Sequence, residues 1–333
     1  MTLTVTHNEE DCPMTENQLD PAVEWPIRMR PGDVPVSVSQ ARLRSKESND
    51  LALAQLDPKL TPSSEIDGSI DTPHGAMAIR VLRPAGPAPK PTIVYFHGGG
   101  WVLGDLDTHL GHARRICVQV DAVVVSVAYR LAPEHPFPAA FDDAVLATQW
   151  AAEHLDELGG NSTLVVAGDT VGGQLAASVA LARRDAGQPL AAQLLLYPVT
   201  DVLGRYADPA VNDYYMSRGT SHQRFGLTLD GMTAFAHHYV GDEDSGDWRV
   251  SPMRASDFSG VAPAVIHTST LDVLRTEGNF YADKLRAAGV VVIAREFPSL
   301  NHSYFGLGGI SAVADAAAAQ AAEDLHEVLA SRE

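Results

Sequence analysis

The segment from Leu164 to Ser178 places a hydroxyl-bearing residue, Thr170, in a glycine turn between an apolar run and a helical pattern. Gly168 and Gly172 flank it with the spacing of a nucleophile elbow, although that pattern carries serine at its centre. Backbone N–H groups at the start of the following helix, including that of Val171, favour a developing negative charge. By itself the segment also fits an ordinary strand-turn-helix connection, so it needs catalytic partners elsewhere in the chain.

A base and an orienting carboxylate are available downstream. Asp272 follows the apolar run 263–269, and His302 follows the apolar run 290–297. The chain order is therefore nucleophile, acid, base, as in one large group of hydrolases. A histidine oriented by a carboxylate can remove the proton of a hydroxyl nucleophile, so we predict Thr170, Asp272 and His302 as the catalytic residues.

A run of three glycines supplies candidate donors for an oxyanion hole. His97-Gly98-Gly99-Gly100-Trp101 follows the β-rich run 92–96. Glycines allow backbone N–H groups to approach a ligand oxygen closely, and such donors stabilise the charge of a tetrahedral intermediate. We predict that Gly98, Gly99, Gly100 and Val171 form this oxyanion hole.

The elements that must position these residues alternate between strand and helix. Strands are predicted at 76–84, 92–96, 122–130, 164–168, 191–199, 263–269 and 290–297, and helices at 141–160, 172–184, 279–289 and 310–330. Alternation of this kind predicts parallel βαβ units, with apolar strands buried on both faces. We expect an α/β fold with a mostly parallel central sheet flanked by helices, whose site lies beyond the carboxyl ends of the strands.

Two segments interrupt this rhythm. Residues 1–60 are polar, with weak helical patterns at 38–44 and 51–56, and residues 203–240 lack strand patterns but end in a helical stretch. We predict that 61–333 form the main domain, that 203–240 are a cap insertion, and that 1–60 contribute to the same cap.

With these motifs in place, the chain resembles the hormone-sensitive-lipase family of α/β-hydrolases, in its bacterial carboxylesterase branch. The motifs that carry the likeness are HGGGWVLGDLDTH (97–109), YRLAPEHPFPAAFDD (129–143), GDTVGG (168–173), LDVLRTEG (271–278) and NHSYF (301–305). The resemblance implies the α/β-hydrolase fold, a cap, and hydrolysis of a small-molecule ester or carbonyl substrate without a cofactor. It also implies Asp272 as triad acid, His302 as base and Gly98–Gly100 with Val171 as the oxyanion region; homodimers are compatible with the family.

The sequence departs from the family pattern at several positions. The family has serine where Thr170 stands, and usually alanine, proline and glycine where Val171, Val273 and Ser303 stand. The stretch 203–225 is also longer than the usual connection, so the residues that select the substrate differ.

Threonine at the elbow leaves several interpretations open. The added methyl crowds the attacked carbonyl, and a β-branched residue is disfavoured at positive φ. The chain is then an ester hydrolase or acyl-transfer enzyme with a hindered nucleophile, a dehydratase or lyase acting on a β-hydroxy carbonyl compound, or a small-molecule-binding protein. The resemblance includes plant 2-hydroxyisoflavanone dehydratases, which carry threonine here, and gibberellin receptors, which lack the histidine. A laboratory Ser→Thr substitution is a further alternative.

A cluster at Asp105, Asp107, His109 and His112 has side chains that bind metals, but most of it matches a family loop that holds none. We therefore expect no metal. The two cysteines, Cys12 and Cys117, do not indicate a disulfide framework.

Composition excludes other classes of partner. Acidic residues outnumber basic ones by 42 to 24, a net charge of −18 that disfavours nucleic acid and anionic membranes. The first twenty residues have no apolar core typical of a signal peptide, and the apolar runs are too short to span a bilayer. A cytoplasmic location is the prediction.

Overall fold

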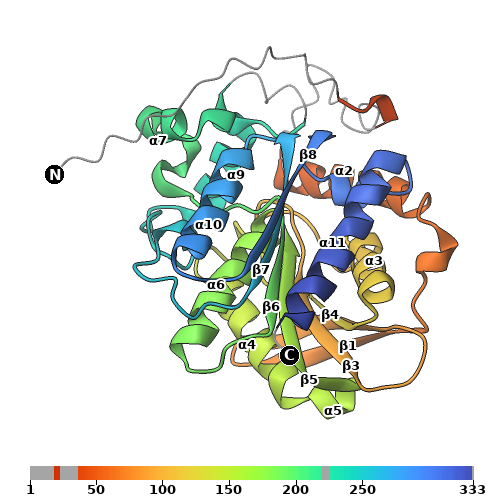
Figure 1. Cartoon of the computed structure of the whole chain (residues 1–333). Helices are drawn as coiled ribbons and strands as arrows, with labels where there is room; N and C mark the ends of the chain where they lie inside the picture. The colour runs from red at the N-terminus through yellow and green to blue at the C-terminus, as the bar shows by residue number, and fades with distance from the viewer. Residues whose placement is uncertain (1–18, 23–36, 220–225, 332–333) are drawn as a thin grey trace.

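The computed structural model describes residues 19–22, 37–219 and 226–331, which fold around one eight-stranded sheet (Figure 1). The order across the sheet is β1-β2-β4-β3-β5-β6-β7-β8. The strands are β1 (Ser64–Thr72), β2 (Gly75–Arg83), β3 (Lys90–Phe96), β4 (Val123–Val127), β5 (Gly160–Asp169), β6 (Ala192–Leu196), β7 (Ala264–Leu271) and β8 (Val292–Asn301).

The sheet is parallel from β4 to β8, and β1 and β2 extend it as an antiparallel hairpin. Every residue of β4, β6 and β7 is buried, which is typical of parallel strands covered on both faces. The mostly parallel α/β architecture predicted from the alternating pattern is confirmed. The strand β1 was not predicted, because its sequence, SEIDGSIDT, has only two large apolar residues.

The helices are α2 (Val38–Leu53), α3 (Leu110–Val120), α4 (Ala139–Glu153), α5 (Leu155–Leu158), α6 (Val171–Asp185), α7 (Pro209–Tyr214), α9 (Leu229–Val240), α10 (Arg275–Ala287) and α11 (Ala312–Ala330). Buried side chains of α4, α6 and α10 share one apolar core, and those of α3 and α11 share another. The sheet is thus covered on both faces, as predicted.

Two helix boundaries differ from the sequence-based prediction. Residues 38–44 and 51–56 were expected as separate weak helices, but one helix, α2, includes 38–44 and continues to Leu53, within the second predicted stretch. The single helix expected at 141–160 is divided at His154, which leaves the helical conformation at φ −118°. Gly159 then ends α5 at φ +81°, a left-handed conformation that glycine adopts without strain.

The predicted cap segments lie at one end of the sheet. Figure 1 shows α2, α7 and α9 at the end where the parallel strands have their carboxyl termini. The helical pattern at the end of 203–240 is confirmed as α9. Residues 1–18, 23–36 and 220–225 lie outside the described residues, and with them Cys12, so the division into a main domain and a cap stays a prediction.

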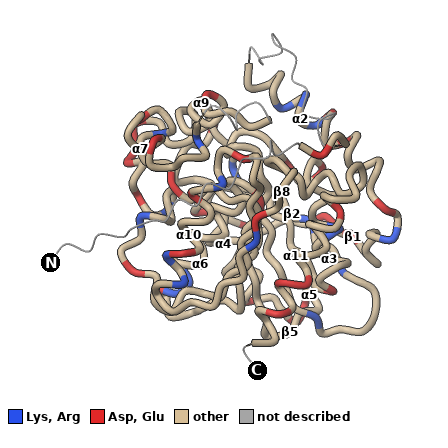
Figure 2. The backbone as a smooth tube through the Cα atoms, turned by 45° about the horizontal axis from the view of Figure 1, so that its top comes forward, with Lys and Arg blue, Asp and Glu red and all other residues tan. Residues whose placement is uncertain are grey.

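Figure 2 shows acidic and basic positions interspersed along the described chain. Within the described ranges, no helix is long and apolar enough to cross a bilayer. Cys117 is a buried free thiol whose pKa is raised by burial to about 12, so it is not a reactive nucleophile. Cytoplasmic location and dimer formation stay predictions.

A buried ion pair fastens the segment after β6 to α10. The Arg218 guanidinium donates to Glu277 through Nε at 3.1 Å and to the carbonyl oxygen of Asp201 at 2.7 Å. The rings of Tyr206 and Tyr215 lie over the guanidinium, with centroids 4.2 and 4.4 Å away. Both charged side chains are fully buried, so removing one partner leaves an uncompensated charge.

We expect Arg218→Met to lower the free energy of unfolding by about 3–5 kcal/mol, because Glu277 would stay buried without its partner. Denaturant unfolding measures the change. The control is Arg286→Met, which breaks an exposed pair with Asp283 and should change stability by less than about 1 kcal/mol. Equal effects of the two substitutions would show that the buried pair is not a stabilising anchor.

Candidate active site

Thr170 forms the turn between β5 and α6, as the glycine pattern predicted. Its backbone has φ 50° and ψ −114°, a region that β-branched residues rarely adopt. A Cβ on Gly172 would lie 1.9 Å from the carbonyl oxygen of Phe96, and one on Gly168 would lie 2.2 Å from the carbonyl carbon of Gly172. The absence of side chains at these two positions is therefore what allows the chain to turn this sharply.

The methyl group of Thr170 packs toward the glycine loop. A Cβ added to Gly98 would lie 2.2 Å from Cγ2 of Thr170 and 2.4 Å from Oδ2 of Asp169. Gly98 consequently leaves the space that the extra methyl occupies. Thr170 is 6% exposed, and it lines the cavity described below.

Asp272 and His302 are brought together by the ends of β7 and β8. Nδ1 of His302 lies 2.8 Å from Oδ2 of Asp272, a hydrogen-bond distance. The other carboxylate oxygen of Asp272 accepts the backbone N–H of Leu274 at 2.9 Å. The ring of Tyr197 packs edge-on against His302, which further fixes its orientation. With Nδ1–H donated to the carboxylate, Nε2 of His302 is left as the basic nitrogen.

Thr170 and His302 line one cavity but are not hydrogen-bonded to each other in this structure. The hydroxyl of Thr170 also makes no bond that caps α6. Catalytic hydrogen bonds are often long before substrate binds and shorten only in the complex, so this geometry leaves a proton transfer available.

Asp169, which precedes Thr170, holds the glycine loop in place. Its Oδ1 accepts the N–H of Gly98 at 2.9 Å and the hydroxyl of Tyr95 at 2.6 Å. Burial favours the neutral acid, but the nearby His109 and the Tyr95 hydrogen bond outweigh it and hold the pKa of Asp169 well below its usual range. Asp169 is therefore an anion at neutral pH.

Of the four predicted oxyanion donors, Gly98 is already committed to Asp169. The N–H groups of Gly99 and Gly100 have no acceptor among the described residues, and Val171 begins α6, where a helix leaves its N–H unpaired. Gly99 and Gly100 have φ values of 115° and 64°, which only glycine adopts without strain. The loop thus presents two free donors beside that of Val171.

His97 belongs to the scaffold of this loop. Its ring stacks on Tyr129 with centroids 4.3 Å apart, and Nδ1 lies 2.8 Å from the carbonyl oxygen of Gly98. Burial lowers the pKa of His97 to about 4, so the ring is neutral at pH 7. A neutral buried ring of this kind orients backbone rather than exchanging protons with substrate.

The cavity in front of Thr170 has a volume of about 630 Å³, large enough for a small organic substrate. Apolar side chains on its wall include Leu103, Leu227, Met232, Phe235, Leu307 and Ile310, and polar ones from α2 include Arg44, Ser45, Glu47, Ser48 and Asn49. A Cβ on Gly100 would lie 2.3 Å from the ring of Phe235, so this ring closes directly over the glycine loop.

Other acidic residues noted in the sequence have structural roles. Asp107 pairs with Arg80 at 3.0 Å, and the Asp105 carboxylate accepts the N–H of Thr108 at 2.7 Å. Asp143 forms a two-pronged pair with Arg130.

Sequence reasoning did not identify the parts played by Asp169 and Phe235. The role of Asp169 could have been suspected from its position immediately before the predicted nucleophile. For Phe235 the sequence offered only the helical pattern of 229–240, which does not show that this side chain faces the cavity.

Comparisons with known proteins identify the family to which this chain is similar. Residues 93–306 match a family model described as alpha/beta hydrolase fold. Carboxylic ester hydrolase LipN of Mycobacterium tuberculosis is 43% identical over 258 residues, covering 74% of this chain and 66% of LipN. Carboxylesterase NlhH of the same species is 40% identical over 285 residues, covering 81% and 82%.

A solved structure is similar along nearly the whole length. The hyperthermophilic esterase from the archaeon Pyrobaculum calidifontis superposes with a TM-score of 0.83 at 33% identity, covering 93% of this chain and 98% of the esterase. The family-model match over residues 93–306 includes the elbow, the glycine loop and the ends of β7 and β8. The chain belongs to the α/β-hydrolase fold family, in its hormone-sensitive-lipase-like carboxylesterase branch.

Proposed function

We propose that this protein is an enzyme that hydrolyses carboxylic esters with Thr170 as nucleophile, His302 as base and Asp272 as orienting acid. The observation that carries the proposal is the Asp272–His302 hydrogen bond at the cavity that Thr170 lines. The esterase names of the relatives support the reaction class. The substrate partner is then a small-molecule ester, and no cofactor takes part.

The proposed reaction has two halves, the acylation of Thr170 and the hydrolysis of the acyl-enzyme. Nε2 of His302 takes the hydroxyl proton of Thr170 while Oγ1 attacks the ester carbonyl carbon. Asp272 stabilises the imidazolium through Nδ1, and the N–H groups of Gly99, Gly100 and Val171 stabilise the oxyanion. The imidazolium then protonates the leaving alkoxide, and water activated by the same histidine releases the acid and restores Thr170.

The methyl group of Thr170 hinders the attack on the ester in the proposed reaction. The strained backbone and the contact with Gly98 restrict where Cγ2 can lie, so Oγ1 reaches the carbonyl with less freedom than a serine oxygen. Small misplacements of a nucleophile lower rate steeply. We therefore propose a working but hindered ester hydrolase.

A second candidate is elimination from a β-hydroxy carbonyl compound. Its supporting observation is that Thr170 makes no hydrogen bond to His302, which leaves both free to act on different parts of a substrate. His302 would remove the α proton, the glycine loop would hold the enolate, and Thr170 would bind the leaving hydroxyl. A purely ligand-binding role ranks below both, because His302 and its carboxylate are retained.

A covalent intermediate is the direct test of the proposed nucleophile. With 4-nitrophenyl butyrate under acid quench, we expect a butyryl mass increase on the peptide that contains Thr170. Thr170→Val keeps the shape but removes the oxygen, and should lower kcat by about 1000-fold or more. Turnover that persists in Thr170→Val would exclude this nucleophile. Dehydration activity that survives without any adduct would favour the elimination reaction.

Thr170→Ser tests the role of the methyl group. We expect kcat for short-chain esters to rise about 10- to 100-fold, because serine removes the crowding while keeping the hydroxyl. Steady-state kinetics measure the change, and thermal unfolding serves as the control that the fold is kept. A kcat that stays level or falls would mean that the pocket is shaped around threonine for other chemistry.

Phe235→Ala tests how the cavity selects its substrate. Removing the ring that lies over Gly100 should raise kcat/KM for octanoyl relative to butyryl esters by about tenfold, since a few buried methylenes are worth that much. Phe280→Ala is the matched control, because that ring packs on Tyr214 and does not line the cavity. A chain-length profile that changes equally in both variants would contradict the assignment.

A further inference from the structure

Three potential metal ligands meet in the wall of the cavity. The ligand atoms of His109, His112 and Asp169 all lie within 4.8 Å of one another, and all three residues are buried. His109 and His112 come from the start of α3, and Asp169 comes from the end of β5. We grouped these histidines with Asp105 and Asp107 in the sequence and expected no metal there. In the structure Asp169, and neither of those two acids, lies with the histidines, and the metal site proposed below departs from that expectation.

The contact between His109 and Asp169 has the length of two ligands around one ion. Nε2 of His109 lies 3.7 Å from Oδ2 of Asp169, too long for a charge-assisted hydrogen bond. Two atoms bonded to one ion at about 2.1 Å are separated by about 3.0–4.2 Å, depending on the angle between the bonds. The observed separation falls inside this range.

The hydrogen bonds around these two residues leave Nε2 of His109 and Oδ2 of Asp169 facing each other. Nδ1 of His109 lies 3.0 Å from the hydroxyl of Thr108, which also lies 3.1 Å from the carbonyl oxygen of Asp105. An ion bound at Nε2 would take the place of a proton between His109 and Oδ2 of Asp169, whose Oδ1 is the oxygen that accepts from Tyr95 and Gly98. An outer hydrogen bond on the second ring nitrogen is typical of histidines that ligate metals.

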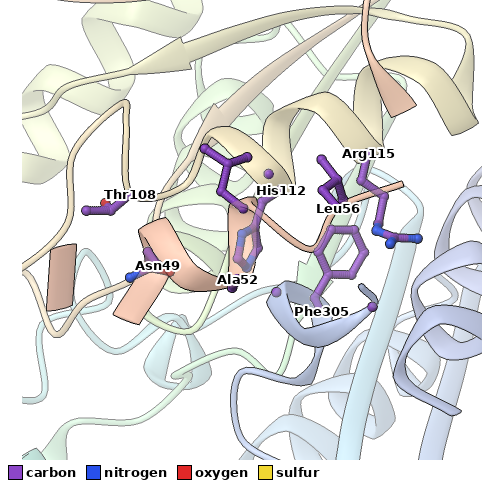
Figure 3. Close-up of a pocket in the computed structure, with 11 residues that line it drawn as sticks. Asn49, Ala52, Leu56, Thr108, His112, Arg115 and Phe305 are labelled. Carbon is purple, nitrogen blue, oxygen red and sulfur yellow. The ribbon is translucent and has the colours of Figure 1, made fainter. Parts of the chain in front are cut away.

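His112 supplies a third donor that the fold leaves unused. It is 6% exposed, and its ring nitrogens make no hydrogen bond within the described ranges of the chain. It lines both the main cavity and a small adjoining space (Figure 3), where it points between Ala52 and Phe305. A largely buried imidazole whose nitrogens have no protein partner is unusual.

We propose that His109, His112 and Asp169 form a binding site for a divalent first-row transition-metal ion beside the nucleophile elbow. Two imidazoles and one carboxylate make a mixed nitrogen and oxygen set that suits Zn²⁺, Co²⁺ or Fe²⁺ and leaves coordination positions open. All three residues line the cavity, so those positions face the space that substrate enters. The proposal does not depend on the proposed ester hydrolysis.

Titration of the metal-free full-length protein with CoCl₂ tests this site without an activity assay. We expect visible d–d absorption that saturates at one Co²⁺ per chain and is bleached by ZnCl₂. His112→Leu should weaken Co²⁺ binding by about 100-fold or more, since loss of a ligand exceeds the 10- to 100-fold effect of losing an outer partner. Calorimetry measures the affinity.

Two controls separate the site from other causes. His135→Leu, at an exposed histidine, should leave Co²⁺ binding unchanged. Thr170→Val should also bind Co²⁺ with unchanged stoichiometry, which separates this proposal from that of the nucleophile. No saturable Co²⁺ spectrum, or equal binding by His112→Leu and His135→Leu, would overturn the proposal. The 3.7 Å contact between His109 and Asp169 would then involve a proton and no metal ion.

Discussion

The sharp backbone turn at Thr170 is the constraint on which the site depends. A β-branched residue is held at φ 50° between a buried strand and a helix, and it is tolerated because its neighbours have no side chains. Gly168 and Gly172 let the chain fold back on itself, and Gly98 leaves space for the methyl group. The same turn places the hydroxyl at the cavity and the unpaired N–H of Val171 behind it.

Asp169 transmits this constraint to the rest of the site. One carboxylate oxygen fixes Gly98 and Tyr95, which sets the path of the glycine loop, while the other faces His109. One buried anion thus joins the elbow, the oxyanion loop and the start of α3. Because Asp169 accepts the N–H of Gly98, this hydrogen bond fixes the path of the glycine loop. The N–H groups of Gly99 and Gly100 remain available to an oxyanion.

Much of the architecture could be predicted from local patterns. Continuous apolar runs identified the parallel strands, and glycines identified the elbow. The edge strand β1 was not predicted because most of its residues are polar. The helix α2 was predicted as two separate helices because its apolar pattern is weak.

Contacts between distant segments were harder to predict. Asp272 and His302 were paired from chain order because each follows a strand that reaches the same edge of the sheet. The approach of Asp169 to His109, sixty positions apart, and of Phe235 to Gly100 carries no short-range signal and depends on how the helices pack.

The central claim is that Thr170 attacks, and a crystal structure after reaction with an alkyl phosphonate ester tests it most directly. The account predicts a covalent bond from Oγ1 of Thr170 to phosphorus, with the phosphonyl oxygen within hydrogen-bonding distance of the N–H groups of Gly99, Gly100 and Val171. A phosphonate that remains intact in the cavity, or that modifies another residue, would contradict it.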